Sequence, residues 1–141
     1  MATHGLPSWP WHGTDPADLP EAERLLLDAL RAWAEPGPGG PVAQAALLLT
    51  AAGLEAAALP LDAALRALPG LRAACPLCPR LNESEGALLL AVAAAQRGRR
   101  GVALALLHRL APPLSAYQAM SALLTLACTL KHNGTLLQPA L

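Results

Sequence analysis

Residues 82–132 read NESEGALLLAVAAAQRGRRGVALALLHRLAPPLSAYQAMSALLTLACTLKH, and this stretch decides the fold. Its glycines and prolines divide it into three consecutive helices, over about residues 82–98, 100–110 and 115–132. The first two helices have almost no polar face, and a helix that is apolar on every side must be covered by protein or by lipid. The longest uninterrupted apolar run, 87–95, is shorter than the roughly 18 residues that a membrane span requires. We therefore expect these helices to form the centre of the protein, with no membrane span.

The composition indicates an all-α protein. The chain of 141 residues contains 32 Ala and 32 Leu but only three Val, no Ile and no Phe. Ala and Leu are among the best helix formers, whereas strands use β-branched and aromatic residues. The length is typical of one domain. We predict a compact bundle of five or six short Ala/Leu-rich helices.

Helix signals also organise the first half of the chain. The capping pattern Asp18-Leu19-Pro20-Glu21 predicts a first helix, whose charged side chains, Arg31 among them, should form a solvated face. Further helices are expected over 41–52 and 61–68. A Pro/Gly linker at 35–40 and an irregular Cys-containing connection at 69–81 complete a single helical domain over 18–141.

The first 17 residues are proline-rich and predict an extended N-terminal arm. Trp9 and Trp11 flank Pro10 within it. One interpretation is that the indoles pack on the helices and fix the arm, because exposed tryptophan is unfavourable. The other is that Trp9 and Trp11 form a docking peptide for a partner.

The charges are divided along the chain. All ten acidic residues lie at or before Glu85, so residues 1–85 have a net charge of −5 and residues 86–141 a net charge of +5. Such asymmetry predicts either that the two halves pack against each other or that the basic half contacts an anionic partner. Arg97, Arg99 and Arg100, at the tip between two helices, are the candidate contacts for an anion, a nucleic-acid backbone or another partner.

The cysteines and one histidine suggest a metal site. Cys75 and Cys78 form a C-x-x-C pair, and Cys128 and His132 lie four residues apart on one helix face, a ligand set suited to tetrahedral zinc. Against it, Pro79 provides no N–H for a thiolate, and Cys128 fits a buried position as a small hydrophobe. Unligated cysteines, a redox C-x-x-C pair and a disulfide between Cys75 and Cys78 are the alternatives.

No pattern of residues predicts an enzyme. Outside the solvated N-terminal faces there are no paired carboxylates, and neither a phosphate-binding glycine loop nor a serine nucleophile motif is present. Excess apolar surface instead predicts a protein–protein interaction module (an adaptor, chaperone-like or regulatory subunit), with a protein partner or a second copy bound and no cofactor. A zinc-stabilised regulatory or nucleic-acid-associated domain is the alternative, and a small-molecule pocket between the helices at 82–98 and 115–132 is a third. The N-terminus lacks the features of a signal peptide, so we expect a cytoplasmic protein.

Overall fold

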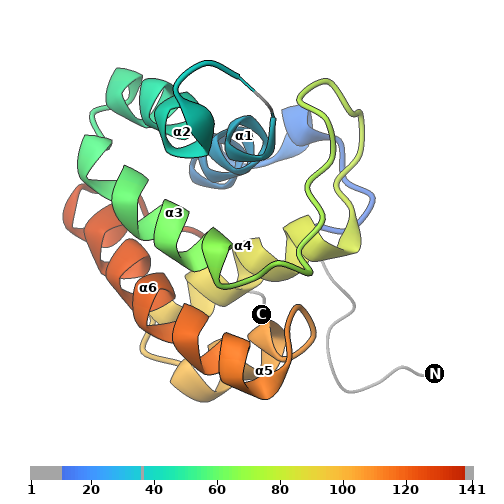
Figure 1. Cartoon of the computed structure of the whole chain (residues 1–141), viewed down its shortest axis with the longest axis vertical. Coiled ribbons are helices and arrows are strands. Elements are labelled where there is room, and N and C mark those ends of the chain that lie inside the picture. The colour runs from blue at the N-terminus through green and yellow to red at the C-terminus, as the bar shows by residue number, and fades with distance from the viewer. Residues whose placement is uncertain (1–10, 36, 139–141) are drawn as a thin grey trace.

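The computed structural model describes residues 11–35 and 37–138, and in this part of the chain it is all-helical (Figure 1). Six α-helices surround one core, joined by turns and by two single-turn 3-10 helices, η1 (Pro16–Asp18) and η2 (Glu55–Ala57). The helices are α1 (Glu21–Ala34), α2 (Gly40–Ala51), α3 (Ala58–Arg66), α4 (Glu83–Gln96), α5 (Arg100–Leu107) and α6 (Pro113–His132). The predicted all-α bundle is confirmed.

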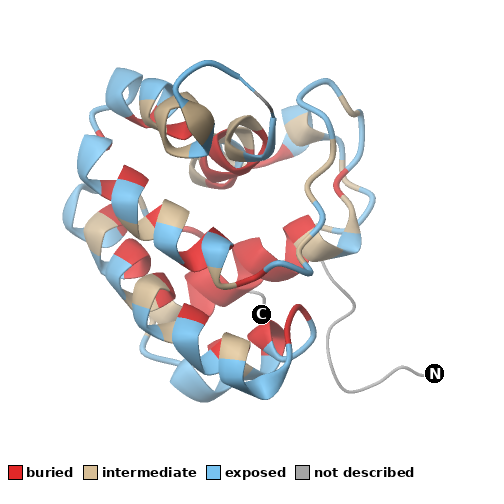
Figure 2. Ribbon diagram, viewed as in Figure 1, coloured by how far each residue is buried: buried red, intermediate tan, exposed pale blue. Residues whose placement is uncertain are grey.

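Helix α4 occupies the centre of the fold. Its side chains are buried from Glu85 to Ala94 without interruption, which explains why it needs no polar face (Figure 2). Asn82 and Glu85 form a capping box at its start. At its end Gly98 adopts a φ of +74°, a conformation that favours glycine, and this sharp turn leads directly into α5. Helix α4 packs on α5 and α6, α1 packs on α2, and α3 packs on α6.

Three helix starts differ from the prediction. Helix α1 is preceded by Pro20 with no side-chain cap, because Asp18 belongs to η1. Helix α3 begins at Ala58, so Pro60 lies within its first turn. The N–H groups of a first turn make no hydrogen bond within the helix, so the N–H that proline lacks is not needed there. Helix α6 begins at Pro113, so Ser115 lies inside the helix and does not cap it.

The ends of the described chain are held by specific hydrogen bonds. At the N-terminal side, Gly13 N–H donates to Leu81 O (2.9 Å) and Leu81 N–H donates to Thr14 O (3.0 Å). At the C-terminal side, the buried Gln96 amide donates to Thr135 O (2.9 Å) and accepts from Leu137 N–H (2.8 Å). Leu137 is fully buried, so the described end of the tail enters the core. No helix in residues 11–35 and 37–138 is long and apolar enough to cross a membrane.

Candidate functional site

A buried ion pair joins α1 to the start of α4. Arg31 Nε lies 2.8 Å from Glu85 Oε2, and Arg31 Nη2 lies 3.0 Å from Glu85 Oε1. The Arg31 side chain is 2% exposed and that of Glu85 is 0% exposed. Hydrogen bonding to the Glu85 carboxylate raises the pKa of Arg31, against the opposing effect of burial. The predicted solvated position of Arg31 was therefore wrong.

The same two side chains hold the connection that runs from residue 67 to residue 82. Arg31 donates to the carbonyls of Cys78 (3.0 Å) and Arg80 (3.1 Å). Glu85 accepts from the backbone N–H groups of Ala74 (2.9 Å) and Asn82 (3.0 Å). The guanidinium fork and the carboxylate thus use their remaining hydrogen-bonding capacity on the backbone of a segment without regular structure. The connection is irregular, as predicted, and these hydrogen bonds fix the conformation of its backbone.

The connection presents the C-x-x-C pair at its outer turn. Cys78 N–H donates to Cys75 O (3.0 Å), which closes a tight turn with Pro76 and Leu77 at its tip. The two Sγ atoms are 3.1 Å apart; Cys75 is exposed and Cys78 is half-buried. The hydrogen bond between the two thiols, aided by the backbone N–H groups of Leu77 and Cys78 and by the Arg31 charge, lowers the pKa of Cys75, whereas the same bond raises the pKa of Cys78. The two thiols are therefore chemically unequal.

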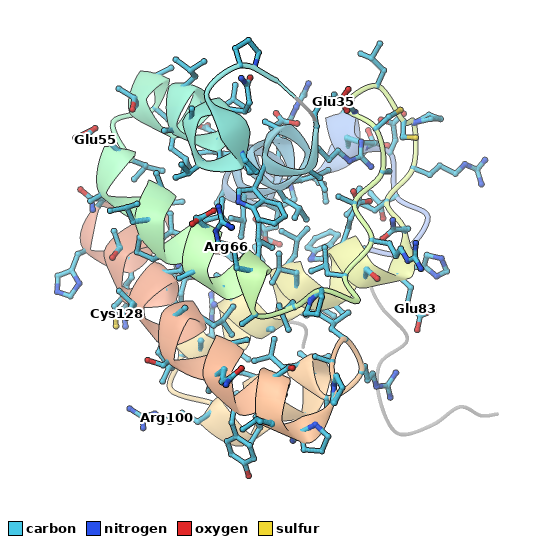
Figure 3. The ribbon with its side chains drawn as sticks, in the orientation of Figure 1. Glu35, Glu55, Arg66, Glu83, Arg100 and Cys128 are labelled. Carbon is cyan, nitrogen blue, oxygen red and sulfur yellow. The ribbon has the colours of Figure 1, made fainter. Side chains whose placement is uncertain are left out.

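The structure does not bring the predicted zinc ligands together. Cys128 lies on α6 at the opposite side of the view from the yellow-green connection that carries Cys75 and Cys78 (Figures 1 and 3). Within residues 11–35 and 37–138 no group of three or more His, Cys, Asp or Glu residues is placed to hold a metal ion. Cys128 is exposed, so its predicted burial was also wrong, and the His132 ring lies 2.9 Å from Cys128 O through Nδ1. The sequence spacing correctly predicted that Cys75 lies near Cys78 and that Cys128 lies near His132. It could not predict how far apart the two pairs lie.

The other predicted contacts have different environments. Arg99, just before α5, and Arg100, the first residue of α5, are exposed. Arg100 is labelled in Figure 3. Arg97 is half-buried and donates to Ala93 O (3.2 Å). Trp11 is partly buried against the core beside Gly86 of α4, in agreement with an arm fixed on the helices. Trp9 lies outside the described residues. An anion contact at Arg97, Arg99 and Arg100 stays a prediction, and so does a docking role for the tryptophans.

Helix α2 has an exposed apolar surface, whose residues the predicted excess of apolar surface did not identify. Only Ala45 and Leu49 of this helix are fully buried, while Leu47 is 69% exposed and Leu48 is 39% exposed. Leu59, in the first turn of the neighbouring α3, is 72% exposed. The sequence of α2 contains no charged residue, so its pattern does not show which of its sides is exposed. We call Leu47, Leu48 and Leu59 the α2 surface.

Comparisons of the chain with protein-family models, curated proteins and solved structures found no match.

Helices α4 and α6, between which a small-molecule pocket was one prediction, pack directly on each other. The Gln96 amide of α4 donates to Ala127 O of α6 (3.4 Å). A shallow depression on the surface of α6 is lined by Leu124, Thr125, Cys128, Thr129, His132 and Asn133. The functional possibilities are thus the α2 surface, the dithiol turn and the arginine tip.

Proposed function

We propose that the chain is a non-enzymatic helical protein–protein interaction module that docks through the α2 surface. The observation that carries this proposal is the contrast between two apolar helices. Helix α4 is covered by the fold, whereas α2, which contains no charged residue, leaves two leucines exposed on its outer side. An apolar helix with one uncovered side is typical of a surface that a partner completes.

The occupant that best fits the α2 surface is a second copy of the chain. In a two-fold dimer the same surface meets itself, so a charge close to the axis would face its own copy in the partner. The α2 surface carries no charge, and α2 presents the small residues Ala43 and Ala51 beside Leu47, which allow two helices to approach closely. The side chains of the α2 surface and of these two alanines therefore bring no like charges together across the two-fold axis.

Analytical ultracentrifugation of the purified chain over a range of concentrations tests the proposal. The wild-type protein should form a dimer, and the double variant Leu47→Glu/Leu59→Glu should sediment as a monomer. Full burial of one leucine contributes about 1.5–3 kcal/mol, and each substitution acts in both copies, so the dissociation constant should rise at least about a hundredfold.

Leu114→Glu is the matched control, because Leu114 is 71% exposed on α6 and lies outside the α2 surface. This variant should dimerise like the wild type, and all three proteins should show the same helical circular dichroism. A wild-type protein that stays monomeric at every concentration would contradict the choice of a second copy as the occupant. Equal association of the wild type and the double variant would contradict the choice of surface.

A further inference from the structure

We infer that Cys75 and Cys78 form a thiol–disulfide exchange site, in which Cys75 attacks a low-molecular-weight disulfide and Cys78 resolves the product. This inference does not rest on the α2 surface or on self-association. It rests on the geometry of one turn, on the unequal exposure of the two thiols, and on the buried groups that fix the turn in place.

The turn brings the two cysteines to a spacing that a disulfide accepts. The ends of a tight four-residue turn lie within about 7 Å, and a disulfide joins Cα atoms about 4.4–6.8 Å apart. Pro76 occupies the second position of the turn, where its fixed φ favours the bend. The sulfurs already face each other at 3.1 Å. Bond formation therefore needs only a small approach of the two side chains.

The buried ion pair limits the motion of the turn on both sides. Glu85 holds the N–H of Ala74, the residue before Cys75, and Arg31 holds the carbonyl of Cys78 itself. Fixing these positions reduces the conformational entropy that the chain loses when the two sulfurs meet. Arg31 and Glu85 are in this sense positioning residues for the dithiol. The positive charge of Arg31 also favours a thiolate at the turn.

Exposure and acidity assign the roles of the two thiols. Exchange begins with a thiolate that is accessible to the incoming disulfide. Cys75 is exposed and has the lowered pKa, whereas Cys78 is half-buried and has the raised pKa. Cys75 is therefore the attacking cysteine and Cys78 the resolving cysteine.

The exchange proceeds in two balanced steps. The Cys75 thiolate attacks one sulfur of the small disulfide, forms a mixed disulfide and releases the other half as a thiolate, which takes a proton from water. Cys78 then loses its proton to water and attacks Cys75 Sγ, which forms the Cys75–Cys78 bond and releases the second half as a thiolate that also takes a proton from water. The protein loses two electrons and two protons, and the small disulfide becomes two thiols.

Oxidised glutathione, reacted with the reduced full-length chain, tests the assignment. Acid-quenched samples are digested and the modified cysteines identified by mass spectrometry. The wild type should accumulate the Cys75–Cys78 disulfide with little mixed disulfide at Cys75. Cys78→Ser should accumulate a stable mixed disulfide at Cys75, formed severalfold faster than at Cys128, since the backbone N–H groups of the turn and the Arg31 charge still favour the Cys75 thiolate in this variant.

Cys128 serves as the internal reference, because it is an exposed cysteine of the same chain. In Cys75→Ser, Cys78 should react more slowly than Cys75 does in Cys78→Ser. Circular dichroism verifies that each variant is folded. A wild-type protein that keeps glutathione on Cys75 without forming the internal disulfide would overturn the exchange site. Reaction of Cys75 no faster than that of Cys128 would overturn the role assigned to Cys75.

Discussion

Arg31 of α1 and Glu85 of α4, 54 residues apart in the sequence, form a two-point ion pair in the interior of the protein. Between them they also make four hydrogen bonds to the backbone of the connection, at Ala74, Cys78, Arg80 and Asn82. A buried ion pair loses much of its attraction to the cost of removing both charges from water. Its main effect here is to specify one conformation for a segment that has no helix of its own.

Replacement of Arg31 by Met should strongly destabilise the protein. The substitution leaves the Glu85 carboxylate buried without a counter-ion, so the free energy of unfolding should fall by about 3–5 kcal/mol in urea denaturation. The double variant Arg31→Met/Glu85→Leu should recover only part of this loss, because it leaves no uncompensated charge but removes the four hydrogen bonds to the backbone of the connection. A loss below about 1 kcal/mol for Arg31→Met, as for an exposed pair, would contradict the buried position.

Glu23 should make stability depend on pH. The side chain is fully buried, its Oε2 accepts from Gln138 N–H (2.7 Å), and its Oε1 has no hydrogen-bond partner in the described part of the chain. Burial raises the pKa of Glu23 above its ordinary value of 4.5, against the opposing effects of backbone hydrogen bonds and the Arg97 charge. The folded chain therefore holds this proton more tightly than the unfolded chain, and stability contributed by Glu23 is lost as pH rises through the raised pKa.

Glu23→Gln removes this titration. The difference in unfolding free energy between the variant and the wild type should therefore move in favour of the variant as pH rises from about 4 to about 7. Urea denaturation at several pH values measures the trend. Glu21→Gln, an exposed position in the same helical turn, shows the effect of removing a surface charge. A difference between Glu23→Gln and the wild type that does not change with pH would contradict the prediction.

Asn82 should stabilise both α4 and the connection. Its Oδ1 accepts from Glu85 N–H (2.8 Å), and its Nδ2 donates to Arg72 O (2.7 Å). Asn82→Ala removes both contacts, so thermal or urea unfolding should show a loss of about 1–2 kcal/mol. Asn82→Ser keeps an N-cap acceptor and should lose less. Equal losses of unfolding free energy in the two variants would contradict a stabilising role for the hydrogen bond between Glu85 N–H and the side chain at position 82.

Two glycines should respond in opposite ways to alanine. A Cβ at Gly86, inside α4, would meet Trp11 and His12 atoms at 3.6–3.9 Å, which is ordinary contact. Gly86→Ala should therefore raise the unfolding free energy by about 0.5–1 kcal/mol, because alanine favours a helix. A Cβ at Gly70 would lie 2.8 Å from Leu110 O, so Gly70→Ala should lower stability. Calorimetric melting of the two variants compares them, and a destabilised Gly86→Ala would contradict the close but unstrained packing at Trp11.

Local patterns predicted much of the fold but little of the candidate sites. The capping box of Asn82 and Glu85 was visible as a spacing of three residues, and the burial of α4 followed from its lack of a polar face. Arg31 was misplaced, because alternating charges on α1 indicate a solvated face unless another segment covers it. The exposed side of α2 was not identified for the converse reason. An apolar helix is expected to be buried by other segments, and the sequence does not show which of its sides they leave exposed.

The sequence by itself determined the all-α class, the approximate helices and the division of charge, because helix propensity, capping and breaking act over a few residues. Only the tertiary structure decided that Arg31 meets Glu85, that the connection folds over this pair, and that Cys75 and Cys78 face each other far from Cys128. These relationships depend on how helices distant in the sequence pack, and many packings satisfy the same local pattern. The buried pair distinguishes among them, since both charges must find their partners in one place.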